Sequence, residues 1–139
     1  MSAKEYLRQL RRLDFEIKAK LDECEWVRHM ATRANVNLSS ERTSGGRRAT
    51  SKVEDCVVKL VMLEESLHRD IAYLAKLKNE AIGKINSLQL SDYRTLLTMR
   101  YVIGRSWEEI AVNMSFSYRH TLRIHGAALT EFETVYKGA

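Results

Sequence analysis

A long apolar stripe that no proline interrupts is the feature that most constrains this chain. The sequence contains no proline and only six glycines, so long helical runs can survive. Between residues 53 and 88, apolar side chains recur at steps of three and four, the spacing of one face of an α-helix. A helix of this length is roughly 54 Å long, and it needs a partner to cover its stripe. The pattern therefore predicts an all-α protein built on long paired helices.

A second apolar stripe, in residues 6–34, supplies that partner. Its members are Tyr6, Leu10, Leu13, Ile17, Leu21, Cys24, Val27 and Ala31. Residues 35–52 are rich in Asn, Ser and Thr and contain Gly-Gly, so we expect a flexible loop between the two helices. The loop would close a long antiparallel helical hairpin, a coiled-coil-like arm over residues 1–90.

Several apolar residues lie outside what one partner helix can cover. They are Leu7, Phe15, Val58, Val61, Met62 and Tyr73. Because two helices give only a thin core, we expect the hairpin to self-associate into a homodimer.

The expected loop is basic. It holds Arg42, Arg47, Arg48 and Lys52 against one acid, Glu41. Side chains of this kind can contact DNA phosphates, and each neutralised phosphate adds salt-dependent affinity. Two interpretations stay open: a phosphate-binding segment and a solvated connector.

Residues 91–139 carry signals for three shorter helices, which we place at about 92–103, 107–114 and 118–136. Two helices joined by three or four residues, as the last two would be, make a helix-turn-helix motif. The first of the three helices is the minimum needed to bury that motif. We therefore predict a second domain over residues 91–139.

Serine and glycine residues mark the ends of these helices. Ser106 with Glu109 three residues later forms a capping box. Ser117 and Ser91 are further N-cap candidates, and Gly104 lies where a left-handed C-cap is needed.

The outer face of the last helix is the predicted DNA-binding surface, because Thr121, Ile124 and Ala128 supply the inward face. The candidate contacts are Ser117, Tyr118, Arg119, His120, Leu122 and Arg123. Arginine pairs bidentately with guanine in the major groove, and apolar or aromatic side chains cover a thymine methyl. No carboxylate occurs between residues 118 and 129, where arginines and histidines supply positive or potentially positive groups. Arg105 is a further candidate for a phosphate contact. An ordinary helical hairpin with surface arginines is the alternative.

The composition narrows the function classes. The net charge of +5 is compatible with double-stranded DNA as a partner. Residues 1–52 are the most basic part of the chain, with 12 basic and 7 acidic groups. The four histidines have no metal-ligand spacing, and no glycine loop could cradle a phosphate, so we expect no catalytic site, no metal and no cofactor. Cys24 and Cys56 are expected to be reduced core residues of a cytoplasmic protein, with a disulfide as the alternative. No apolar run is long enough to span a membrane.

The C-terminal third resembles region 4 of bacterial RNA polymerase sigma factors. The likeness lies in Leu97, Arg100-Tyr101, Gly104, the run from Ser106 to Ala111, and Ala128-Leu129. More narrowly, the runs 100–101, 106–111, 117–120 and 124–129 are similar to small sigma-region-4-like regulators encoded in phages and prophages of Gram-positive bacteria.

The resemblance implies control of phage gene transcription by binding a promoter and contacting RNA polymerase. Because the chain is too short to contain the other promoter-reading regions of a sigma factor, an activator or accessory subunit fits better than a replacement sigma factor. The alternative is a protein-interaction module that binds RNA polymerase or another partner through its helical arm, without direct DNA readout.

Overall fold

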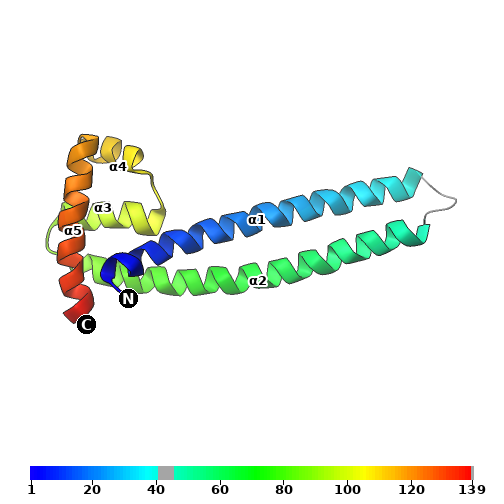
Figure 1. Ribbon diagram of the computed structural model, residues 1–139, viewed down its shortest axis with the longest axis horizontal. Helices are drawn as coiled ribbons and strands as arrows, with labels where there is room; N and C mark the ends of the chain where they lie inside the picture. Colours follow the sequence, from blue (N-terminus) through cyan, green and yellow to red (C-terminus); the bar gives the residue numbers. More distant parts are fainter. Residues whose placement is uncertain (41–45, 139) are drawn as a thin grey trace. The chain divides into compact units, whose positions relative to one another are not determined.

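The computed structural model describes residues 1–40 and 46–138, with the side chains of residues 1–33 and 51–138. Within these residues the elements are α1 (Ala3–Ser40), α2 (Gly46–Asn86), α3 (Ser91–Leu97), the π-helical stretch η1 (Thr98–Ile103), α4 (Trp107–Met114) and α5 (Tyr118–Gly138) (Figure 1). The described part of the chain contains no strand, and the predicted all-α class is confirmed. None of its helices is both long and apolar enough to cross a membrane.

The two long helices extend further than their apolar stripes predict. They include residues 35–40 and 46–52, which the sequence assigned to a loop, while residues 41–45 lie outside the described residues. Asn and Ser are weak helix formers, but adding a residue to an existing helix costs far less than starting one. A helix that an apolar stripe stabilises can therefore extend beyond the last residue of that stripe.

The chain forms two compact units, and each contains part of α1 and part of α2. Unit 1 comprises Met1–Asp14 and Tyr73–Ala139, and unit 2 comprises Phe15–Ala72. The boundary predicted at residue 90 remains a prediction.

In unit 2, α1 and α2 lie side by side in opposite directions, and ion pairs connect them (Figure 1). Lys20 pairs with Asp70, and Arg28 Nη2 lies 2.7 Å from Glu64 Oε1. The buried apolar residues of this unit are Ile17, Cys24, Val27 and Leu67. Both cysteines are free.

Much apolar surface of unit 2 stays exposed. Its exposed large residues are Phe15, Leu21, Trp26, Met30, Val57, Val58, Val61, Met62 and Ile71. A two-helix arrangement buries one stripe of each helix and leaves the flanking positions in solvent. Of the apolar residues that the sequence placed outside the reach of one partner helix, four in unit 2 are exposed, namely Phe15, Val58, Val61 and Met62. In unit 1, Tyr73 is also exposed, whereas Leu7 is fully buried.

Unit 1 has a thicker core, because α5 packs on α3 and α4 and the start of α1 joins them. The Tyr6 ring lies 5.1 Å from that of Tyr136 and 6.3 Å from that of Phe132, measured between ring centroids. The amide of Ala3 donates to Glu133 Oε2 at 3.1 Å. The largest fully buried side chains of the unit are Phe132, Leu7, Leu10, Ile85, Leu88, Leu96, Leu97, Ile110 and Thr121.

The ends of α3 and η1 test two predicted caps. Ser91 is the first helical residue, and the N-cap position falls on Leu90, whose side chain makes no capping bond, so the prediction for Ser91 is wrong. Arg94 Nη1 instead donates to the carbonyls of Leu88 at 2.6 Å and Gln89 at 2.8 Å. Gly104 ends η1 with φ 92°, a left-handed conformation that glycine adopts without strain, so the predicted C-cap is confirmed.

Candidate nucleic-acid interface

The segment from α4 to α5 has a cap at each helix start. Ser106 Oγ accepts a hydrogen bond from the amide of Glu109 at 3.2 Å, and Ser117 Oγ accepts one from the amide of His120 at 3.1 Å. Both predicted N-caps are confirmed. Each satisfies an amide that the first turn of a helix leaves without a partner.

A three-residue turn connects the two helices. Ser115 adopts a left-handed conformation, with φ 58° and ψ 38°, and the amide of Phe116 donates to the carbonyl of Ala111 at 3.0 Å. A non-glycine residue in this region is uncommon, and the sequence carries no signal that would have identified Ser115. The turn fixes the direction in which α5 leaves α4.

The inward faces of α4 and α5 pack closely. Ile110 and Thr121 are fully buried, and Ala111 is 7% exposed. Thr121 Oγ1 donates to the carbonyl of Ser117 at 2.8 Å, so its hydroxyl has a partner inside the core. This packing holds α5 by one face and leaves the other in solvent.

The free face of α5 carries the residues predicted to contact DNA. Arg119 and Arg123 are exposed, and neither forms an ion pair or hydrogen bond with the described residues. Tyr118 is 48% exposed and Leu122 is 39% exposed, in the same two turns. His120 is half-buried, with its ring centroid 4.7 Å from that of Phe116 in an edge-on arrangement.

His125 has a structural role. Its Nε2 lies 2.7 Å from the Tyr101 hydroxyl, and its ring centroid is 4.4 Å from that of Trp107. Burial, followed by the charges of Arg100, Lys4 and Arg8, lowers the pKa of His125 to about 4. His125 is therefore neutral at pH 7 and adds no positive charge to α5.

Three arginines converge beside the start of α4. Arg11 Nη1 donates to the carbonyl of Arg100 at 3.0 Å and to that of Arg105 at 3.4 Å, and Arg100 Nη1 donates to the carbonyl of Arg105 at 3.2 Å. The Arg100 guanidinium lies over the Trp107 ring, 4.2 Å from its centroid. Burial, and then the charge of Arg11, lowers the pKa of Arg100.

Arg105 was predicted as a phosphate contact, and it is about half exposed with a 3.7 Å ion pair to Glu109. Sequence reasoning missed Arg11 as a neighbour of Arg100 and Arg105, because 89 and 94 positions separate it from them along the chain. Only the return of α1 to unit 1 brings them together.

The other predicted phosphate contacts do not belong to this cluster. The side chains of Arg42, Arg47 and Arg48 lie outside the described residues. Lys52 is exposed on α2 in unit 2. Among the described residues, no group of three or more histidine, cysteine or acidic side chains could hold a metal ion.

The comparisons with known proteins give a family and no function. The family model DUF1492, described as a protein of unknown function, matches residues 34–133. No curated protein and no solved structure matches the chain.

Proposed function

This chain belongs to the DUF1492 family, whose description assigns no function, and we propose from its own residues that it is a sequence-specific DNA-binding regulator of transcription. The helix α5, starting after Ser117, reads the major groove of double-stranded DNA. The protein acts in the cytoplasm as an activator or sigma-like accessory factor for phage genes, and it contacts RNA polymerase at the promoter.

One observation carries the proposal: α5 is packed on one face, and its other face presents Arg119 and Arg123, which have no partner among the described residues. The guanidinium groups are available to base edges because no described carboxylate pairs with them. In helix-turn-helix proteins, the first residues of the second helix contact the bases. Tyr118 and Leu122 would supply the apolar contacts that a thymine methyl favours.

The distribution of charge supports the same surface. Unit 1 contains 13 basic and 8 acidic residues, whereas unit 2 contains ten of each. The whole net charge of +5 therefore belongs to the unit that contains α5. A basic domain attracts the phosphate backbone and brings the reading helix to the duplex.

The resemblance of residues 93–129 to sigma factor region 4 adds the regulatory context. The likeness extends to the order of a helical arm before the DNA-binding unit, since α1 and α2 precede α3 to α5 in this chain.

Selection of binding sites from random duplex DNA tests the proposal. The wild-type protein should enrich one sequence, and Arg119→Ala and Arg123→Ala should each lose about 1–3 kcal/mol of affinity for it and relax one base position. Lys137→Ala is the matched control, because Lys137 is exposed near the other end of α5 and pairs only with Glu133 at 3.1 Å. Failure to enrich any sequence, or equal affinity of all three variants, would refute DNA readout by α5.

A second candidate function is association of two copies through unit 2. Val57, Val58, Val61 and Met62 form an apolar patch over two turns of α2, with exposures of 48–64%. A net charge of zero in unit 2 means that two copies meet without repulsion from excess charge. A two-fold interface is self-complementary, so the patches of two α2 helices can cover each other.

Sedimentation velocity at micromolar concentration tests this homodimer. The wild type should sediment as a dimer, and the double variant Val58→Lys with Met62→Lys should sediment as a monomer with unchanged helix content. A monomeric wild type would refute the second copy as the partner, and a separate binding assay with RNA polymerase would then ask whether the arm contacts the enzyme instead.

A further inference from the structure

We infer that the first three turns of α1 form a second contact with the DNA backbone, through a basic surface made of Lys4, Arg8, Arg11 and Arg12. This inference rests on the proposed function and deepens it, because it assigns the phosphate contacts to α1, an element far from α5 along the chain. The ligand is the phosphate backbone of duplex DNA, and no base is read by this surface.

The four basic residues share one side of α1. At about 100° per residue, Lys4, Arg8, Arg11 and Arg12 fall within an arc of about 100°. The buried residues of the same turns, Ala3, Tyr6, Leu7 and Leu10, occupy the opposite side. Lys4, Arg8 and Arg12 are exposed, and Arg11 is half-buried.

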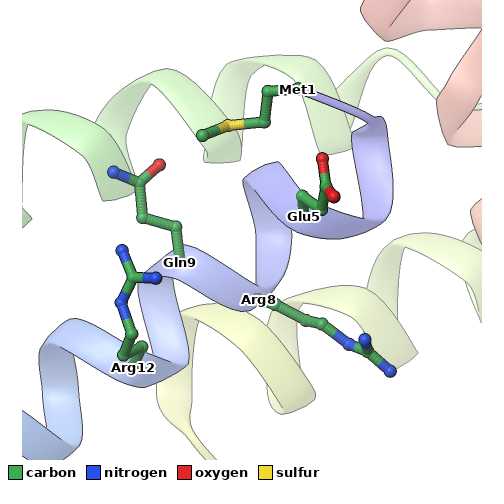
Figure 2. Close-up of a pocket in the computed structure, with 5 residues that line it drawn as sticks. All are labelled: Met1, Glu5, Arg8, Gln9 and Arg12. Atoms are coloured by element: carbon green, nitrogen blue, oxygen red, sulfur yellow. The ribbon is translucent and has the colours of Figure 1, made fainter.

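Two of these four residues also line a pocket at one edge of the surface. Figure 2 shows Arg8 and Arg12 among the residues that line it, together with Met1, Glu5 and Gln9. Glu5 is the one acid there, and its carboxylate already accepts a hydrogen bond from the amide of Ser2 at 2.8 Å. Lys4 and Arg8 form no ion pair with the described residues, so the fold leaves their charge for a partner.

The surface continues to the start of α4, the first helix of the proposed DNA-binding motif. Arg11 donates to the carbonyls of Arg100 and Arg105, which places the edge of the arc beside the start of α4. Basic residues therefore extend from α1 to Arg100 and Arg105.

The spacing suits a nucleic-acid strand. Lys4 and Arg12 are separated by about 12 Å along the helix axis, and each strand of duplex DNA carries one phosphate per about 3.4 Å of its axis. The row thus matches the length of three or four phosphates. A protein partner would match this row of cations only if it carried a row of carboxylates with the same spacing.

Salt titrations of DNA binding test the inference. The double variant Lys4→Ala with Arg8→Ala removes two cations of this surface that form no ion pair with the residues that the structure describes. With the selected duplex and with a scrambled duplex, the slope of log affinity against log salt should become shallower by about 1.8, since each lost phosphate contact contributes about 0.9. The ratio of the two affinities should stay unchanged, because no base contact is lost.

The control is the double variant Lys76→Ala with Lys137→Ala, which removes the same charge from unit 1 outside the arc and should leave the slope unchanged. Far-ultraviolet circular dichroism and the melting temperature confirm that both proteins are folded. If the wild type selects a sequence but Lys4→Ala with Arg8→Ala keeps the wild-type slope, this inference fails and the proposed function stands. If the wild type selects no sequence, both fail.

Discussion

Unit 1 and unit 2 are built from opposite ends of the same two helices, yet they bury their apolar residues to very different degrees. In unit 1, α3 to α5 join the helix ends and enclose side chains such as Leu7 and Phe132 completely. In unit 2, α1 and α2 have only each other, and Phe15 and Met62 remain 58% and 64% exposed. An apolar stripe alone therefore does not determine burial, because the number of partner helices decides how much of a helix's surface is covered.

The two units also differ in net charge. The excess of basic residues lies entirely in unit 1, where it surrounds the start of α4 and follows α1. Unit 2 is neutral, and its ion pairs connect one helix to the other. A well-packed basic unit and a neutral unit with exposed apolar patches differ as the two proposals require, with DNA proposed as the partner of the first and a second copy of the chain as the partner of the second.

The largest expected effect compares two phenylalanines. Phe132→Ala should reduce the free energy of unfolding by about 3–5 kcal/mol, because it leaves a cavity in a closed core. Phe15→Ala should cost less than about 1 kcal/mol, because the ring is already half in solvent. Urea titration followed by circular dichroism measures both, and equal costs would mean that the packing of the two units does not differ as described.

Local signals were sufficient to predict the ends of the short helices. Ser106, Ser117 and Gly104 act within five residues of their own position, so their roles can be identified from the sequence. The prediction for Ser91 failed because α3 begins one residue earlier than expected, so the N-cap position falls on Leu90, whose side chain cannot accept a hydrogen bond. The exposed face of α5 also follows from helical spacing alone.

Contacts between distant parts of the chain could not be predicted in this way. Nothing in residues 1–14 shows that Ala3 meets Glu133 or that Tyr6 meets Phe132, since 130 and 126 positions separate them. Residues 1–14 add four basic and two acidic groups to unit 1 only because the start of α1 packs with the C-terminal helices. Burial of Leu7, which lies off the stripe of its own helix, has the same cause.

A smaller effect on the free energy of unfolding is expected from His125 in unit 1. The unfolded chain protonates His125 near pH 6.5, whereas burial lowers the pKa in the folded chain to about 4. Between these values the unfolded chain binds more protons, so the free energy of unfolding falls as the pH falls from about 6.5 to 4. Each pKa unit corresponds to about 1.4 kcal/mol, and partial solvent access reduces the total to about 1–3 kcal/mol.

Comparison with His125→Gln isolates this effect, because glutamine can still bond the Tyr101 hydroxyl but does not titrate. The difference in unfolding free energy between wild type and variant should shrink by about 1–3 kcal/mol from pH 7 to pH 4. His68→Gln, on the exposed side of α2 in unit 2, is the control. This variant should lose as much unfolding free energy between pH 7 and pH 4 as the wild type. Parallel pH profiles for wild type and His125→Gln would show that burial does not hold this ring neutral.

The smallest effect compares two ion pairs at similar places in the helical pair. Asp14 and Lys78 in unit 1 are 3.0 Å apart, with side chains 24% and 21% exposed, whereas Glu23 and Lys59 in unit 2 are 3.8 Å apart and 45% and 55% exposed. Water screens the second pair more strongly, so a double-mutant cycle should give a coupling energy of about 1 kcal/mol for the first and below about 0.5 kcal/mol for the second. Raising the salt concentration to 1 M, where charges are screened beyond about 3 Å, should remove the weaker coupling and leave part of the stronger one. If the two coupling energies are equal and equally sensitive to salt, the difference between the units does not extend to their ion pairs, and it then lies in apolar packing alone.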